Sequence, residues 1–287
     1  FAGTDDLEVV DEEHRHPRRV EDVLHLGLAR PRRRRREAAR ADRSDPVGLV
    51  EDDDVGPEAP GDLEAARQET ADVATHLLSG AEPESRDEVT LTDFDPDGEV
   101  KVVAAALYAV SELPDDQLLA LARKLGPEER RRVLEAYVGR RANRRHKPGR
   151  AFERTAYRFD VLGDYGAFRD LQRHRLLTLE WQPLSTRHGW VGSEEIETVG
   201  ALPEWRRVME DAAGLYGALA AGGLHDVAPY AVAMAYRVRF YMELNAREAM
   251  HMIELRTTPQ GHPAYRRICQ AMHRLIAEQA GHRAIAA

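Results

Sequence analysis

The spacing of hydrophobic positions divides the chain from residue 87 onward into short strand-like stretches and longer helical ones. Alternating apolar and polar positions predict strands over residues 89–92, 152–161 and 176–181. Apolar residues three and four apart, with Pro or Gly near the ends of several stretches, predict the helices. Their ranges are 99–110, 114–126, 127–138, 165–175, 203–219, 230–256 and 263–280. Few strands among several long helices indicate the α+β class.

The helix predicted to begin at residue 230 carries polar residues on two of its sides. At about 100° per residue, Arg256 falls close to Asn245. Arg247, His251 and Glu254 fall together on the opposite side. A helix that faces solvent has one polar side, so we expect this helix to lie between two packed surfaces, such as two subunits.

Two interpretations of this polar helix stay open. Arg247 reaches His251 and Glu254 within two turns, which would give an internal salt bridge. No carboxylate shares the face of Asn245 and Arg256, which favours a ligand or a partner chain on that side.

Residues 1–87 differ in composition from the remainder, residues 88–287. The first 86 residues contain no Lys, Ile, Asn, Tyr, Trp, Met or Cys, and they include the arginine run 32–36. A segment of this composition can bury too little apolar surface to offset the conformational entropy that it would lose on folding. We therefore expect a low-complexity segment that is either disordered or the product of a misread frame, with helix only around residues 63–78.

Charge and cysteine content narrow the class of protein. The net charge is −9 over 287 residues, which argues against tight nucleic-acid binding by the whole chain. The arginine run and the basic tract 140–147 leave local nucleic-acid binding as an alternative. The single cysteine excludes a disulfide framework, and no apolar run approaches the ~18 residues that span a bilayer. We expect a cytoplasmic fragment of a longer polypeptide, without a membrane segment.

Two separated cationic segments suggest a binding site for a large anion. The triplet Arg173-His174-Arg175 follows a short helical stretch, and residues 245–256 carry further cationic and polar groups on an otherwise apolar helix. Buried polar groups must be paired or bind a ligand. Guanidinium groups grip phosphates through paired hydrogen bonds, so a nucleotide cofactor is the predicted ligand.

The same residues resemble the flavin-dependent thymidylate synthase (ThyX) family. The Arg-His-Arg triplet, the strand upstream of it and the tract 245–266 occur in the order of that family, over roughly residues 88–280. The resemblance is to one half of the long, duplicated ThyX-like proteins. It implies a ThyX-like mixed domain with a small antiparallel sheet and several long helices.

The resemblance also implies the chemistry, which is reductive methylation of dUMP to dTMP. Methylenetetrahydrofolate would supply the carbon, NADPH the reducing equivalents, and FAD would carry the hydride; a homo-oligomer or a partner ThyX-like domain would share the site. Arg256 would hold the pyrimidine and act in catalysis. The implied cofactor-binding residues are Arg173, His174, Arg175, Asn245, Arg247 and His251. Cys269 lies outside every motif and is expected to be a buried thiol.

The chain departs from the family mainly on the dUMP side. A usual Gln is Asp170, a usual Asn-Glu pair is Glu180-Trp181, and the expected Ser is Pro183, with Ser185 nearest to it. By position, the substrate-binding residues implied are Asp170, Glu180, Ser185 and Arg256. A catalytically degenerate domain that only binds flavin, or is purely structural, is therefore the alternative to an active synthase.

A metal site is not expected. His251, Glu254 and His262 offer ligand atoms, and the first two share a helix face. No second carboxylate–histidine pair completes a centre.

Overall fold

The computed structural model describes residues 60–287, which fall into two compact units that divide between Gly80 and Ala81. In the first unit, helix α1 spans Pro60–Leu77 and confirms the helix expected around residues 63–78. The arginine run 32–36 lies outside the described residues. The proposed change of character after residue 87 stays a prediction.

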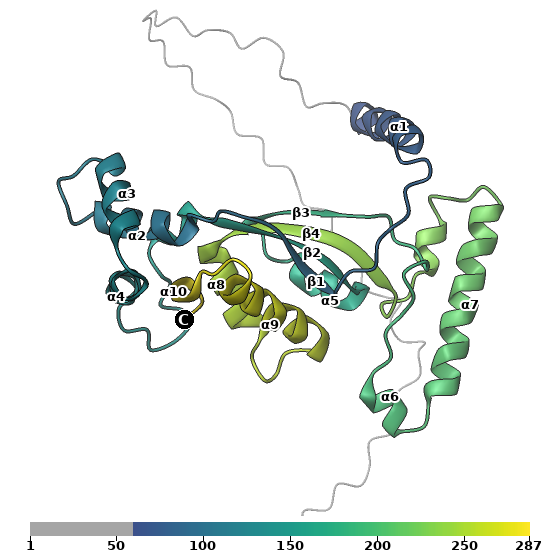
Figure 1. Ribbon diagram of the computed structural model, residues 1–287. Helices are drawn as coiled ribbons and strands as arrows, with labels where there is room; N and C mark the ends of the chain where they lie inside the picture. The colour runs from purple at the N-terminus through teal and green to yellow at the C-terminus, as the bar shows by residue number, and fades with distance from the viewer. Residues whose placement is uncertain (1–59) are drawn as a thin grey trace, which may run out of the picture. The chain divides into compact units, whose positions relative to one another are not determined.

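The second unit is built on a small antiparallel sheet (Figure 1). Its strands are β1 (Val89–Phe94), β2 (Ala156–Asp164), β3 (Leu177–Trp181) and β4 (Arg237–Asn245). They are arranged in the order β1-β2-β4-β3, and every neighbouring pair is antiparallel. This arrangement confirms the predicted α+β fold with a small antiparallel sheet.

Alternation along the two central strands gives the sheet one apolar and one polar face. Residues of β2 and β4 that point to the core are almost fully buried, among them Phe159 and Phe240. On the opposite face, Arg239 forms an ion pair with Asp160 at 2.6 Å. The sheet therefore buries one face only, as expected for an antiparallel sheet with a hydrophobic core on one side.

Most of the predicted helices are present. The longer helices of this unit are α2 (Gly98–Tyr108), α3 (Asp115–Lys124), α4 (Pro127–Val138), α7 (Leu202–Ala221), α8 (Ala246–Arg256) and α9 (Pro263–Glu278). Shorter ones are α5 (Tyr165–Leu171), α6 (Glu194–Thr198), α10 (Arg283–Ala286) and the 3₁₀ turns η2 (Arg150–Arg154) and η3 (Ala228–Ala231). Among the described helices, none is both long and apolar enough to cross a membrane.

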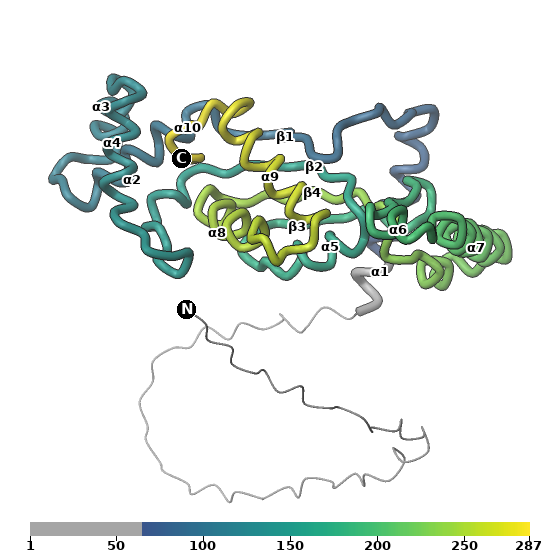
Figure 2. The backbone as a smooth tube through the Cα atoms, turned by 90° about the horizontal axis from the view of Figure 1, so that it is seen from below, coloured from purple at the N-terminus to yellow at the C-terminus, as the bar shows by residue number. Residues whose placement is uncertain are grey.

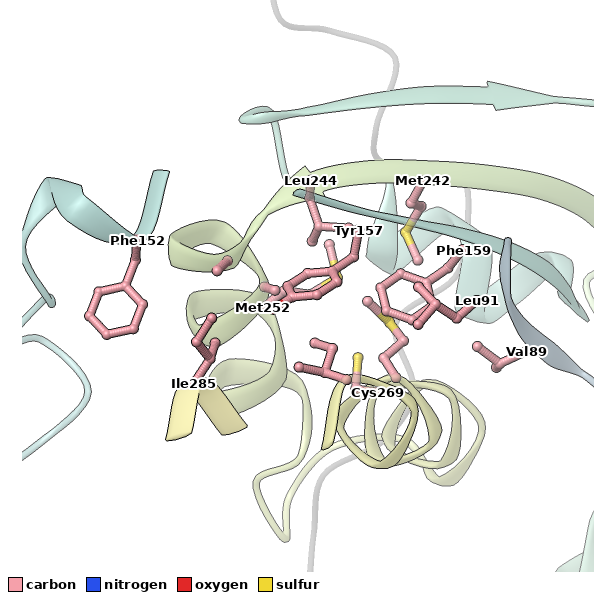
Figure 3. Packing of buried hydrophobic residues seen from close by; sticks show 14 of the residues in the cluster. Val89, Leu91, Phe152, Tyr157, Phe159, Met242, Leu244, Met252, Cys269 and Ile285 are labelled. Atoms are coloured by element: carbon pink, nitrogen blue, oxygen red, sulfur yellow. The ribbon is translucent and has the colours of Figure 1, made fainter. Parts of the chain in front are cut away.

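Helices α8 and α9 cover the apolar face of the sheet, with α5 beside them (Figure 2). Figure 3 shows Met252 of α8 and Cys269 of α9 among Tyr157 and Phe159 of β2. Cys269 is fully buried, which confirms the expected buried thiol. The core thus packs α8 against the strands, and α8 carries much of the candidate site.

The single helix predicted over residues 230–256 is wrong. Residues Arg237–Asn245 form β4, a central strand, and the helix begins only at Ala246. Val238, Phe240 and Met242 are buried at every second position, which is the period of a strand. The mixture of apolar and aromatic residues concealed this alternation within a longer apolar stretch.

This correction also removes the argument from two polar sides of one helix. Asn245 is the N-cap of α8, and its Oδ1 accepts from the backbone N–H of Glu248 at 2.9 Å. The strand predicted over 152–161 also begins later than expected, at Ala156. The 3₁₀ turn Arg150–Arg154 precedes it and buries Phe152.

Candidate functional site

Three separate segments line a cavity of about 410 Å³ in the second unit. They are helix α8, the triplet that follows α5, and the loop between α4 and η2. Seven cationic residues line the cavity, with only two carboxylates: Arg141, Arg144, Lys147, Arg173, Arg175, Arg247 and Arg256 against Glu248 and Glu254. This excess of positive charge suits an anionic ligand.

Helix α5 sets the position of the triplet. Asp164 caps its start, because Oδ1 accepts from the backbone N–H of Ala167 at 2.8 Å. At its end, the backbone N–H of His174 donates to the carbonyl of Leu171 at 3.1 Å. The chain turns here so that His174 is buried, whereas the side chain of Arg173 is 70% exposed.

Glu248 lies beneath the triplet and joins two histidines. Its Oε1 is 2.9 Å from Nδ1 of His174 and 3.3 Å from Nδ1 of His251. Burial alone would raise the pKa of Glu248, but the hydrogen bonds from the two histidines outweigh it, and the net shift of this pKa is downward. Glu248 is therefore a buried, ionised acceptor.

Arg256 decides the protonation pattern of His174. Its Nε lies 3.2 Å from Nε2 of His174, and a guanidinium can only donate. Nε2 of His174 must accept, so the proton of the neutral ring is on Nδ1 and is donated to Glu248. The chain Arg256–His174–Glu248 is thus a directed set of hydrogen bonds.

The same contacts account for the one close group of potential metal ligands found among the described residues. His174, Glu248 and His251 place one ligand atom each within 4.8 Å of one another. Because Nδ1 of His174 carries a proton, that nitrogen has no free lone pair for a cation. The trio considered from the sequence, His251 with Glu254 and His262, is not this group.

Asp170 forms ion pairs with two arginines of the site. Its carboxylate lies 3.3 Å from Arg173 and 3.7 Å from Arg256, and its backbone carbonyl accepts from Nη2 of Arg256 at 2.5 Å. No carboxylate shares the helix face of Arg256, as the sequence indicated, but a carboxylate from another segment of the chain lies beside it in place of the ligand or partner chain that we expected. This carboxylate belongs to α5, a segment that helix periodicity could not include.

The internal salt bridge considered for α8 is also wrong. Arg247 donates to the carbonyl of Pro148 at 2.9 Å and to Glu153 at 3.2 Å. Glu254 instead receives two hydrogen bonds from Arg141, at 2.5 and 2.8 Å. These residues join α8 to other segments and not to one another.

The structure brings together only some of the residues predicted for the site. Arg173, His174, Arg175, Arg247, His251 and Arg256 all line the cavity. Asn245 is a helix cap, Glu180 is exposed on β3, and Ser185 is buried with Oγ accepting from the backbone N–H of Arg187 at 3.4 Å; none of these three lines the cavity. Asp170 lines a second cavity of about 800 Å³ and reaches the first through its arginine partners.

Sequence reasoning did not assign several residues that line the cavity, among them Glu248, Arg144 and Lys147. Glu248 was one of several polar residues on an apolar helix, and its burial was the available signal. Arg144 and Lys147 were noted only as part of a basic tract. Their position over the cavity depends on contacts with α8 that local patterns do not reveal.

Comparison with known proteins shows which family the chain belongs to. The model of the family described as "Thymidylate synthase complementing protein" matches residues 90–280. A UPF0159 protein of Chlamydia pneumoniae is 37% identical over 212 residues, which cover 74% of this chain and 40% of that protein. A UPF0159 protein of Thermoplasma acidophilum is 36% identical over 177 residues, covering 61% of this chain and 35% of that protein.

These curated relatives are longer than the chain, which spans about two fifths of their length. Among solved structures, the UMP/dUMP methylase PolB from Streptomyces cacaoi, bound with 5-Br dUMP, is similar at a TM-score of 0.53. The sequence identity is 20%, and the match covers 70% of this chain and 95% of that one. At this identity the likeness establishes the fold.

Proposed function

The chain belongs to the thymidylate synthase complementing protein family, and from that membership we propose that it binds FAD in the cationic cavity and takes part in the reductive methylation of dUMP to dTMP. One observation carries the proposal. The triplet after α5 and the helix α8, far apart in the sequence, direct arginines into one cavity.

The residues of the cavity fit a flavin dinucleotide. Arg173 and Arg175 present guanidinium groups, which can donate paired hydrogen bonds to a diphosphate. His174 is held in place by its contacts with Glu248 and Arg256, so it offers a fixed polar surface beside them. When bound, FAD supplies a hydride carrier between NADPH and the pyrimidine, and methylenetetrahydrofolate supplies the carbon.

Arg256 is proposed to bind and activate the pyrimidine of dUMP. Its side chain is 14% exposed, so charge on a neighbouring ligand is weakly screened. Its Nη1 reaches Asp170 only at 3.7 Å, which leaves this N–H group as the donor to a substrate carbonyl. A fixed guanidinium at that position would stabilise negative charge that develops on the pyrimidine ring.

A second ThyX-like domain or another copy of the chain is proposed to complete the site. Glu180 and Ser185, two of the substrate residues implied by the family, do not line the cavity formed by this chain. Groups from a partner would then supply the remaining contacts to dUMP and the folate.

The arginines that line one cavity are also compatible with a second candidate function, a flavin-binding domain without synthase activity. In addition, the carboxylate of Asp170 lies beside both Arg173 and Arg256, where it would repel the phosphate of dUMP. A supporting domain of this kind would retain flavin but would not process dUMP.

Two measurements test the proposal. After incubation with FAD and gel filtration, the protein should retain the visible absorbance of a flavin, and Arg173→Ala with Arg175→Ala should abolish retention. A protein that stays colourless contradicts flavin binding. Release of tritium from 5-tritiated dUMP, with NADPH and methylenetetrahydrofolate present, then separates the synthase from the purely flavin-binding domain.

A further inference from the structure

The basic loop between α4 and η2, residues 139–149, is fastened to α8 at both ends. Near its start, Arg141 donates two hydrogen bonds to Glu254, at 2.5 and 2.8 Å. Near its end, the carbonyl of Pro148 accepts from Nε of Arg247 at 2.9 Å. Because Glu254 and Arg247 are two turns apart on α8, the loop is stretched along the helix beside the cavity.

Contacts within the loop hold its shape between the two anchors. The carbonyl of His146 accepts from Nε of Arg141 at 2.6 Å. The backbone N–H of His146 donates to the carbonyl of Asn143 at 3.1 Å. Oδ1 of Asn143 accepts from the backbone N–H of Arg145 at 2.9 Å. The turn is therefore specified by its own residues, and it directs Arg144 and Lys147 to the cavity wall.

The charges of the cavity lining are unequally compensated. Arg141 and Arg247 have carboxylate partners in Glu254 and Glu153, and Arg173 and Arg256 share Asp170. Arg144, Lys147 and Arg175 have no carboxylate within ion-pair distance among the described side chains of residues 65–287. Three uncompensated cations on two sides of one cavity give a place where two neighbouring negative charges are stabilised.

We propose that Arg144 and Lys147 form, with Arg175, a clamp for the diphosphate of the flavin dinucleotide. This inference rests on the proposed function, since it assigns to the loop a part of the same cavity. Arg144 supplies a planar fork for two phosphate oxygens, and Lys147 supplies a mobile point charge. The loop then determines that the site selects a dinucleotide over the uncharged flavin.

The test compares two pairs of substitutions in the full chain. Arg144→Ala with Lys147→Ala removes two charges from the cavity wall. Arg140→Ala with Arg145→Ala removes two charges from the same exposed loop but from residues that do not line the cavity. Flavin fluorescence titrations measure the affinity for FAD and for riboflavin, and the fluorescence of the reduced nicotinamide measures the affinity for NADPH. Retention on an immobilised oligonucleotide is measured alongside, and melting curves show that each variant folds.

We expect the first pair to weaken FAD binding about tenfold, which corresponds to about 1.4 kcal/mol. Riboflavin binding should stay within about twofold, because riboflavin carries no phosphate. The control pair should bind FAD like the wild type. The difference between the pairs should shrink as salt is raised.

Several results would overturn the inference, and they are separable from failure of the proposed function. If the wild type binds FAD and the two pairs behave alike, the clamp is wrong and the proposed function stands. A loss confined to NADPH assigns the loop to the other dinucleotide. A loss of oligonucleotide retention without a change in FAD affinity assigns it to nucleic acid. If the wild type binds no FAD, both proposals fail together.

Discussion

Nε of Arg256 donates a hydrogen bond to Nε2 of His174 at 3.2 Å, and this contact fixes the tautomer of a buried histidine. The opposite nitrogen of the ring donates to Glu248 at 2.9 Å. Two residues that the sequence assigned to different ligands, the flavin and the pyrimidine, are therefore coupled through one imidazole. A shift of Arg256 should therefore alter the hydrogen bonds of both His174 and Glu248.

The tautomer can be observed directly. The ¹⁵N chemical shifts of the His174 ring should show a proton on Nδ1 and a free Nε2, because Arg256 occupies Nε2 as a donor. A proton on Nε2 would contradict the arrangement.

Glu248→Ala should lower the free energy of unfolding by about 1–3 kcal/mol, because it leaves the Nδ1–H group of His174 buried without an acceptor. Glu248→Gln should retain most of this stability, since an amide oxygen can still accept. If Glu248 also positions His174 for flavin, both variants should shift the visible spectrum of bound FAD. Glu243→Gln, on the solvent-exposed face of β4, is the control and should change neither property.

Asp170→Asn should strengthen dUMP binding by about threefold to tenfold. The substitution removes a negative charge beside Arg173 and Arg256, while the backbone carbonyl of residue 170 continues to accept from Arg256. Asp116→Asn, exposed on α3, changes the net charge equally and should have no effect. Calorimetric titration of dUMP measures both variants, and equal affinities would show that Asp170 does not face the nucleotide.

Local patterns in the sequence predicted most of the fold, because a strand or helix with one buried face displays its period directly. The strand at 176–181 and the helix from residue 263 are examples, and both are present. Residues 237–245 were wrongly predicted to be helical, because their apolar and aromatic residues continue into α8 without a Gly or Pro between them. The boundary is marked only by Asn245, a residue that favours N-caps.

The sequence indicated the cationic triplet and Arg256 as parts of the candidate site, but it did not indicate which arginines form ion pairs with which carboxylates. Arg256 meets Asp170, and Arg141 meets Glu254, across segments that are distant in the sequence. Such pairs follow from the packing of α8 against the strands and the preceding loops. A helix viewed alone can show only neighbours three or four residues away, which is why an internal salt bridge was considered for Arg247.

Cys269 should be dispensable for any chemistry of this chain. Burial raises the pKa of its thiol to about 12, so the nucleophilic thiolate is nearly absent at neutral pH. Cys269→Ala should retain FAD binding and any tritium release from dUMP, at a cost of about 1 kcal/mol of stability from the lost packing. In the wild type, a thiol reagent should react only on unfolding; rapid reaction with the folded protein would contradict the burial of this side chain.

His282 should make the stability of the second unit depend on pH. Burial lowers the pKa of this ring below its ordinary value of 6.5, although the nearby carboxylates of Glu99 and Asp95 act in the opposite direction. The ring packs against Phe94, and its Nδ1 is 2.9 Å from the hydroxyl of Tyr157. The unfolded chain therefore takes up a proton near pH 6.5, whereas the folded chain takes it up only at lower pH.

The sign of the effect follows from this difference in proton uptake. The stabilising contribution is complete above pH 6.5 and is lost progressively as the pH falls from 6.5 through the folded-state pKa of His282. His282→Gln keeps a polar group near Tyr157 but cannot titrate, so its melting temperature should fall less than that of the wild type between pH 7 and pH 5. His225→Gln, in an exposed loop, is the control and should follow the wild type. Parallel curves for the wild type and His282→Gln would mean that the pKa of His282 is the same in the folded and the unfolded chain.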